Sequence, residues 1–370
     1  MTTAAPTEPR PAPAAPVGPP MRPPPAIAGK GPAPLTPARP VLARRSLASM
    51  IAAPTVAQGD GVVVAGKQKT GKTSSFAFAA PAPIFIFTDR MGDDVLPASF
   101  KDKIKPDAWD DLPGAVSAGL TVLGALRQLR DEEHPYQTVV IDTMNDTEAL
   151  IWDWIIAKDP NGISSIEEVG EGFGKGFTKA QEQVTVMLRI LFDLASKRGM
   201  NWIIISHTDV KTDSDPSEVS YEKWALSLNK KAAAKILGAA NTILFAVPGV
   251  TATNVGKGKA VKMRGGQTNV TRAIVRSRTG IDAGSRWLLP EEMILSWAVY
   301  EQEKARGKDL REQLNKHLSG LSLNDRADAD RFLSEQGHSR AAVEQVIAGF
   351  NSLAIDTTDN ANTEDKDESK

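Results

Sequence analysis

Short apolar runs alternate with longer segments of helical periodicity between residues 61 and 247. The runs are rich in β-branched and aromatic side chains and predict strands at Gly61–Ala65, Ile84–Phe87, Thr138–Ile141, Trp202–Ile205 and Thr242–Val247. The segments between them predict helices at Lys72–Ala79, Pro113–Arg130, Glu148–Lys158, Thr178–Lys197 and Tyr221–Ala239. Apolar strands that alternate with helices are typical of an α/β fold, in which helices cover both faces of a mainly parallel sheet.

The pattern changes after residue 250. The segments Lys257–Arg264 and Thr271–Arg278 flank the turn-like pair Gly265-Gly266, which predicts a hairpin. Beyond Tyr300 we expect a charged helix and a short helical pair around Ala327–Phe350. We therefore divide the chain into a leader at residues 1–49, a core at 50–298, a small helical appendix at 299–354 and a tail at 355–370.

Both ends of the chain have the composition of disordered segments. The leader holds 14 of the 25 prolines, and residues 1–50 carry six basic residues against one acidic residue. The C-terminal stretch from residue 356 carries six acidic residues against two lysines. Each terminal segment is either a solubilising tail or a tether. As tethers, one segment would contact DNA and the other a partner protein.

Overall composition narrows the class of protein. The chain has 370 residues, of which 41% are hydrophobic, and it contains no cysteine, so disulfides and thiolate metal sites are excluded. We find no apolar stretch near the ~18 residues that a membrane span needs, and no secretory signal. We therefore expect a cytoplasmic location without membrane partners. The net charge of −1 gives no overall basic field that would indicate nucleic-acid binding.

The first predicted strand runs into the octet GKQKTGKT, residues 66–73, which matches the phosphate-binding pattern G-x-x-x-x-G-K-[ST]. Gly66 and Gly71 let backbone N–H groups turn toward phosphate, because a Cβ there would block the approach. We expect Lys72 to reach the β- and γ-phosphates and the Thr73 hydroxyl to ligate Mg²⁺. The sequence thus predicts ATP and Mg²⁺ as cofactors, with the nucleotide-binding residues Gly66, Lys67, Gln68, Lys69, Thr70, Gly71, Lys72, Thr73 and Ser74.

Polar side chains follow two further strands, at the sheet edge where such folds bind ligands. Asp142 ends the run Val139–Ile141, and we expect it to act with Thr73 at Mg²⁺. The alternative is a turn residue or a helix N-cap, for which Asp146 is the better candidate. His207 follows the strand Trp202–Ile205 and is either a sensor of the γ-phosphate or a structural histidine.

Asp89 follows the strand Ile84–Phe87 and is the candidate that orients or activates water for hydrolysis. An ordinary turn residue is the alternative. No two of the four histidines share a helix face at metal-ligand spacing, so we predict no zinc site.

Several motifs, in order and spacing, resemble the RecA-like core ATPases encoded by phages. They are VVIDT at 139–143, FGKGF at 173–177, NWIIISHTDVK at 201–211, YEKWALSLNKKAAAKI at 221–236, NTILFA at 241–246 and RSRTGI…LLPEEM between 276 and 293. From about Gly61 to Trp297 the chain is similar to the phage nucleotide-binding protein family, which includes the single-strand annealing recombinases. The resemblance implies a RecA-like fold and ATP-dependent work on single-stranded DNA by an oligomer, ring or filament, in phage recombination or replication.

The resemblance also implies two mobile DNA-binding loops, by position at about 159–177 and 208–222. Side chains there that could contact phosphates or stack on bases are Lys175, Phe177, Lys211, Tyr221, Lys223 and Trp224. The first loop also carries Glu167, Glu168 and Glu171, whose negative charges would repel DNA phosphates. An ordinary flexible crossover is the alternative for both loops.

The predicted hairpin is basic and is a separate candidate surface. Its cations are Lys257, Lys259, Lys262, Arg264, Arg272, Arg276 and Arg278. They could neutralise DNA phosphate, and the family pattern favours Arg276 or Arg278 as an arginine finger on a neighbour's γ-phosphate. A solvated basic face is the alternative. Where relatives tend to carry Glu after the second strand, this chain has Asp89-Arg90, with a shorter carboxylate.

The leading hypothesis is an ATPase that binds single-stranded DNA and promotes annealing or strand exchange. A second hypothesis is a helicase loader or motor subunit whose main target is a protein. A third is an ATP-gated DNA-binding assembly with little hydrolysis. A small-molecule kinase is less favoured, because no lid-like arginine cluster follows the core.

Overall fold

The computed structural model describes residues 57–89, 92–112, 120–213, 221–248, 251–254, 260–263, 271–275 and 284–351. The leader at 1–49 and the tail at 355–370 lie outside these ranges, and so do Lys257, Lys259, Arg264, Arg276 and Arg278. The described residues comprise most of the core, the helices after it and the remaining candidate residues.

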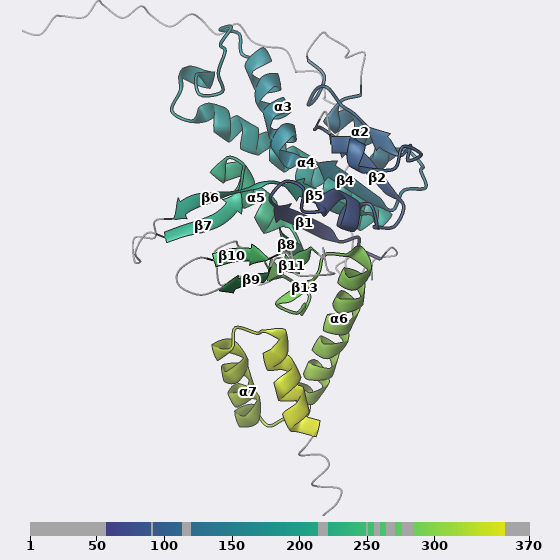
Figure 1. Ribbon diagram of the computed structural model, residues 1–370, viewed down its shortest axis with the longest axis vertical. Helices are drawn as coiled ribbons and strands as arrows, with labels where there is room; N and C mark the ends of the chain where they lie inside the picture. The colour runs from purple at the N-terminus through teal and green to yellow at the C-terminus, as the bar shows by residue number, and fades with distance from the viewer. Residues whose placement is uncertain are drawn as a thin grey trace, which may run out of the picture. The chain divides into compact units, whose positions relative to one another are not determined.

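A nine-stranded sheet runs through the described core (Figure 1). The strand order is β13-β11-β8-β1-β5-β4-β2-β3, with β12 beside β8. The parallel strands are β1 (Gly61–Gly66), β2 (Pro83–Phe87), β3 (Lys103–Ile104), β4 (Thr138–Asp142), β5 (Asn201–Ser206) and β8 (Thr242–Val247). The strands β11 (Arg272–Ile274), β12 (Gly284–Ser285) and β13 (Glu292–Ile294) add an antiparallel edge. The predicted mainly parallel sheet is confirmed.

Strand β1 lies in the middle of the sheet. It pairs in parallel with β5 on one side and with β8 on the other, so that Val63 is opposite both Ile204 and Ile243. Every residue of β1 is buried. Because a fully buried valine side chain contributes about 1.5–3 kcal/mol relative to an exposed one, this strand anchors the loop that leaves its end.

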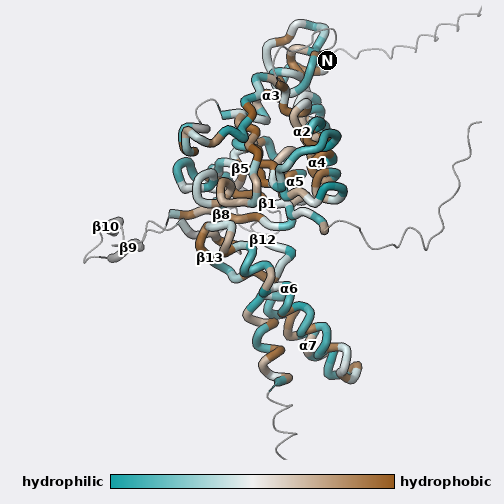
Figure 2. The backbone as a smooth tube through the Cα atoms, turned by 90° about the vertical axis from the view of Figure 1, so that its right-hand side faces the viewer, coloured by the Kyte–Doolittle hydropathy of each residue, from teal (hydrophilic) through white to brown (hydrophobic). Residues whose placement is uncertain are grey.

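Alternate residues of the central strands face two different hydrophobic layers. On one face, residues such as Val63 and Ile204 pack under four helices: α2 (Val122–Asp131), α3 (Met144–Ala157), α4 (Lys175–Arg198) and α5 (Lys230–Ala239). On the other face, Val62 and Val64 pack with the short helix η1 (Lys72–Ala77), the antiparallel edge and the start of α6 (Trp297–Ser319). In Figure 2 the central strands between these layers carry strongly hydrophobic stretches.

Two predicted helix starts differ from the structure. Helix α3 begins at Met144, before the predicted Glu148, and its N-cap is Thr143, not Asp146. The Thr143 Oγ1 accepts a hydrogen bond from the backbone N–H of Asp146 (3.3 Å) and donates to its carboxylate, which makes Thr143 the better cap. In the segment predicted as helix from Pro113, residues 113–119 lie outside the described ranges, and α2 begins at Val122 after the N-cap Thr121.

The predicted helix Tyr221–Ala239 is wrong in its first part. Strand β7 (Tyr221–Leu226) pairs antiparallel with β6 (Thr208–Asp213), so the described parts of the predicted mobile loop at 208–222 are paired strands of a β-hairpin. Alternation places Trp224 and Leu226 on the same side of the strand, toward apolar neighbours. Asn229 then caps α5 by accepting from the Lys231 backbone N–H at 3.0 Å.

The predicted pairing of Lys257–Arg264 with Thr271–Arg278 is also wrong. Strand β10 (Ala260–Met263), which contains Lys262, pairs with β9 (Thr251–Asn254). Strand β11 instead joins the central sheet between β8 and β13. There Ala273 and Val275 are buried in the second hydrophobic layer, and this burial favours the sheet edge over a free hairpin.

In the described C-terminal region, α6, α7 (Leu323–Glu335) and a helix at 340–351 pack around a small cluster that includes Leu314, Leu333 and Val343. Helix α6 begins at Trp297, and its first turn belongs to the core. The rings of Trp297 and Tyr300 meet Phe76 of η1 edge-on, with centroids 5.4 and 5.9 Å apart. Among the described helices, none combines the length and apolar character that a membrane span requires.

A buried carboxylate ties α6 to the start of β1. Asp60 is 3% exposed and accepts hydrogen bonds from the Tyr300 hydroxyl and, at 3.0 Å, from the Trp287 indole. The ammonium of Lys304 lies 3.3 Å from the same carboxylate. Burial, followed by the charge of Asp60, raises the pKa of Tyr300 far above its usual value, so Tyr300 remains a donor.

Removing this donor is expected to destabilise the fold. Tyr300→Phe leaves a buried charge with one partner fewer, which costs about 1.5–3 kcal/mol of unfolding free energy. Tyr136→Phe is the matched control, because the Tyr136 hydroxyl also donates to a carboxylate, that of Asp102, but at an exposed position. Its expected cost is below ~0.5 kcal/mol. Urea unfolding of both variants checks this, and equal losses would contradict the importance of burial.

Candidate functional site

The loops that leave β1, β2, β4 and β5 enclose a cleft of about 500 Å³ at the carboxyl edge of the sheet. Residues Gln68 to Ser74 form one wall, and Asp89, Asp142 and His207 also line it. The structure therefore brings together the P-loop and the three polar residues predicted at strand ends. The cleft is large enough for a nucleotide, since small-molecule sites typically measure about 300–1,000 Å³.

The backbone of the P-loop depends on glycine at two places. Gly71 has a φ of 78°, in the left-handed region that favours glycine, and a Cβ there would lie 2.8 Å from the Ser75 Oγ. A Cβ on Gly66 would lie 2.6 Å from the carbonyl oxygen of Ala246 on the neighbouring strand β8. The loop can therefore pass close to β8 and turn its backbone toward the cleft.

Lys72 is buried at the base of the loop. Its Nζ donates to the carbonyl oxygens of Gly66 (3.0 Å) and Lys67 (2.7 Å). Burial lowers the pKa of Lys72 to about 8, and the negative charge of Asp142 partly opposes this shift. Lys72 is thus a desolvated cation, and a bound anion would stabilise its charged form.

Thr73 and Asp142 meet directly across the cleft. The Thr73 Oγ1 donates to the Asp142 Oδ2 at 2.7 Å. Burial raises the pKa of Asp142 to about 6, while the Thr73 hydrogen bond and the Lys72 charge oppose the rise. A hydroxyl and a carboxylate are the hard oxygen ligands that Mg²⁺ accepts together with water and phosphate, so this pair fits the predicted metal.

Asp89 lies at the end of β2, beside Asp142. Its backbone N–H points to the Asp142 carbonyl oxygen at 3.5 Å, and its own carbonyl accepts from Gly92 at 3.4 Å. These contacts hold the Asp89 loop against the strand that carries Asp142. Asp89 therefore lies in the cleft at the end of β2, and its role in activating water stays a prediction.

His207 is half-buried at the end of β5. Burial, and then the positive charge of Lys72, lower the pKa of His207, so the ring is neutral at physiological pH. Within the described part of the chain its buried Nδ1 has no hydrogen-bond partner. A neutral ring facing the P-loop can exchange a hydrogen bond with a phosphate oxygen or with a water molecule.

Asn145 is a residue of the site that the sequence did not indicate. Its Oδ1 accepts from the His207 backbone N–H (2.8 Å) and from the Ser206 hydroxyl (3.1 Å), while its Nδ2 donates to the Ser227 carbonyl (2.6 Å). All three partners lie far from Asn145 in the sequence, so no local pattern signals this role.

The predicted DNA-contact residues are placed differently from one another. Lys175 lies exposed in the first turn of α4, whereas Phe177 packs edge-on against Trp152 with centroids 5.6 Å apart. The Lys211 ammonium donates to the carbonyl oxygens of Leu226 and Leu228, both at 2.8 Å, and so closes the hairpin on itself. Lys223 lies opposite Lys211 in the hairpin. Of the two phenylalanines in the FGKGF motif, Phe173 is the exposed one, with 99% of its surface accessible.

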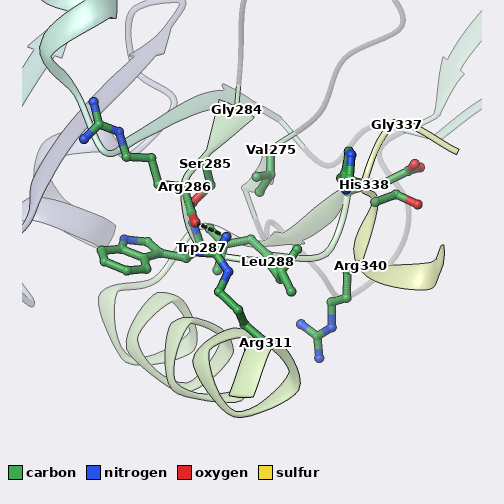
Figure 3. A pocket seen from close by; sticks show the side chains of 13 residues that line it. Val275, Gly284, Ser285, Arg286, Trp287, Leu288, Arg311, Gly337, His338 and Arg340 are labelled. Carbon is green, nitrogen blue, oxygen red and sulfur yellow. Dashed lines mark hydrogen bonds between the residues drawn. The ribbon is translucent and has the colours of Figure 1, made fainter. Parts of the chain in front are cut away.

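A second cavity, of about 320 Å³, lies between residues 284–289 and the helices after the core (Figure 3). Arg311 donates to the Arg286 carbonyl oxygen at 2.8 Å, and Arg340 is paired with Glu303 and Glu344. The Arg286 side chain points away from both of these arginines in Figure 3. No predicted site residue lines this cavity within the described chain.

A mainly parallel sheet with a P-loop at the end of its central strand, and a Thr–Asp pair beside it, defines a P-loop nucleoside triphosphatase. A comparison with protein-family models matches residues 59–287 to the AAA domain, and the chain belongs to that family. No curated protein matches the chain significantly. The family makes this a P-loop ATPase domain, and nucleotide with Mg²⁺ is what such a domain binds.

Nucleotide binding is expected to depend on pH through Lys72 and Asp142. Lys72 must be charged to attract phosphate, and its pKa of about 8 predicts falling affinity as the pH rises above that value. Asp142 must be ionised to hold Mg²⁺. Its pKa of about 6 therefore predicts that Mg²⁺ strengthens nucleotide binding less at a pH below that value. Binding of a fluorescent ATP analogue with and without Mg²⁺, from about pH 5 to pH 10, measures both limbs.

Lys72→Arg is the control for the alkaline limb. Arginine stays charged throughout this range, so the variant should lose the alkaline fall even where its affinity is lower. An unchanged alkaline fall in Lys72→Arg would assign that limb to another group.

Proposed function

We propose that this protein is a RecA-like ATPase that binds single-stranded DNA and uses ATP to promote annealing or strand exchange in phage recombination or replication. It would act as a homo-oligomer, ring or filament, with recombination or replication proteins as further partners through its terminal segments. The observation that carries the DNA part is the fully exposed Phe173 in the loop before α4.

Phe173 is presented by its backbone. It has a φ of 56° and stands between Gly172 (φ 89°) and Gly174 (φ 71°), which turns the ring out of the core. The exposed Lys175 follows it, and the Lys231 ammonium at the start of α5 donates to Thr178 of the first α4 turns at 2.8 Å. An exposed aromatic ring beside lysines suits single strands, because bases stack on the ring while the cations contact phosphates.

In the proposed reaction the residues of the cleft have separate tasks. Lys72 and the P-loop backbone would hold the nucleotide, and Thr73 with Asp142 would hold Mg²⁺, which neutralises charge that develops on the phosphates. Asp89 would orient or activate water, and His207 would report the γ-phosphate to the hairpin that follows it. Arg276 or Arg278 would reach the γ-phosphate of a neighbouring subunit.

A second candidate is a helicase loader or motor subunit that acts on a protein. It is favoured by Lys211, whose ammonium is used inside the hairpin and is not presented to a ligand. The short carboxylate of Asp89 supports a third candidate, an ATP-gated DNA-binding assembly with little hydrolysis.

Steady-state ATPase activity with and without single-stranded DNA tests the proposal. We expect DNA to stimulate turnover in the wild type and Lys72→Ala to abolish it. Phe173→Ala should weaken DNA binding by about tenfold or more, since stacking contributes about 1–3 kcal/mol per base. Leu323→Ala is the matched control, because Leu323 is another highly exposed apolar residue, 87% exposed on α7.

The outcomes separate the candidates. If DNA neither binds nor changes turnover at low salt, the DNA proposal fails and the loader gains support. If ATP promotes DNA binding while wild type turns over no faster than Lys72→Ala, the gated assembly is favoured.

An arginine finger supplied by a neighbour makes a distinct prediction. Arg276→Ala or Arg278→Ala should lose most turnover, by about 10³-fold for the finger itself, while the affinity for ATP is retained. Turnover and nucleotide binding measured on the same preparations check this. Weakened ATP binding by the monomer would argue against a finger acting between subunits.

A further inference from the structure

The β6–β7 hairpin touches the nucleotide loop at a residue that the P-loop pattern leaves variable. The Lys67 ammonium lies 4.8 Å from the centroid of the Trp224 ring in β7. Trp224 also packs against Phe245 of β8, with centroids 5.9 Å apart, so its ring is held against the sheet. A cation over an aromatic face at this distance is an attractive contact.

Lys67 in turn determines where Lys72 is held. The Lys67 carbonyl oxygen accepts from the Lys72 Nζ at 2.7 Å and from the Thr70 hydroxyl at 2.9 Å. A contact that fixes the Lys67 side chain therefore restricts the backbone on which the phosphate-binding lysine rests. Trp224 does not line the cleft itself, so its contact with the P-loop runs through Lys67.

The base of the same hairpin is attached to the other side of the cleft. Asn145 joins Ser206 and His207, at the end of β5, to Ser227, at the end of the hairpin, through its three hydrogen bonds. One turn later on α3, both carboxylate oxygens of Glu148 accept from the Asn229 backbone N–H at 3.1 Å. Since α3 follows directly on the metal-site strand β4 and its N-cap, the segment after that strand holds the end of the hairpin.

We propose that Trp224 and Asn145 are positioning residues that couple the β6–β7 hairpin to the nucleotide cleft, Trp224 through Lys67 and Lys72, and Asn145 through His207. This inference rests on the proposed ATPase function. When Lys72 turns toward phosphate it releases the Lys67 carbonyl, and the Lys67–Trp224 contact carries the change to β7. By linkage, a ligand that moves the hairpin changes nucleotide affinity by the same factor.

A double-mutant cycle tests the first attachment. Lys67→Met keeps the length of the side chain and removes its charge, while Trp224→Leu keeps an apolar contact with Phe245 and removes the aromatic face. Lys67 is exposed, so each single variant is expected to weaken binding of a fluorescent ATP analogue about two- to fivefold, the range of a cation–π contact at an exposed site. The double variant should be no weaker than either single one. Trp224→Phe should recover part of the affinity.

Val210→Ala is the control for this cycle. Val210 pairs with Trp224 across the hairpin and is 49% exposed, and its truncation should leave nucleotide affinity unchanged. Single-variant effects that multiply in the double variant, or unchanged affinities at unchanged thermal stability, would overturn the proposal. If the wild type itself fails to bind the analogue, the ATPase proposal fails instead, which is a separate result.

The second attachment predicts a different kinetic signature. Asn145→Ala releases the His207 backbone and should lower kcat about tenfold or more with little change in KM, whereas the Lys67 and Trp224 variants should mainly raise KM. Asn145→Asp keeps an acceptor for the His207 N–H and should restore part of kcat. Equal losses of kcat in Asn145→Ala and Asn145→Asp, with folding intact, would overturn the assignment.

Discussion

The parallel alignment of β1, β5, β4 and β2 governs the placement of every group in the cleft. Because these strands run in one direction, their carboxyl ends meet at one edge of the sheet. The P-loop, Asp89, Asp142 and His207 come from distant parts of the chain, yet each lies at the end of one of these strands or just after it. The direction of the strands thus creates the cleft, and a short loop after each strand is enough to place its polar group there.

Burial stabilises the sheet and also sets the chemistry at its edge. The same apolar strands that exclude water from β1 desolvate Lys72 and Asp142, and this moves both pKa values toward neutrality. The Thr73–Asp142 hydrogen bond and the attraction between the two opposite charges limit the cost. Because both charged groups are desolvated, a ligand that brings phosphate to Lys72 and a metal ion to Asp142 would stabilise their charged forms.

The elements around the cleft are attached to it by side chains outside the P-loop pattern. Trp224 holds Lys67 from the hairpin, and Asn145 holds His207 from the start of α3. On the opposite face, Trp297 and Tyr300 of α6 support Phe76 just after the P-loop. Three separate segments therefore pack around the cleft: the hairpin at the P-loop, α3 at His207, and α6 at the helix that follows the P-loop.

Apolar runs and glycine spacing report local physics, and they were sufficient to predict the P-loop, the polar residues at strand ends and the parallel strands except the two-residue edge strand β3. They misassigned Tyr221–Leu226 as helix and paired β10 with the wrong partner, since strand pairing depends on which surfaces are left to bury. They also could not reveal Asn145, nor distinguish the exposed Phe173 from the packed Phe177. Those features depend on neighbours that come into contact only when the chain has folded, so no local pattern encodes them.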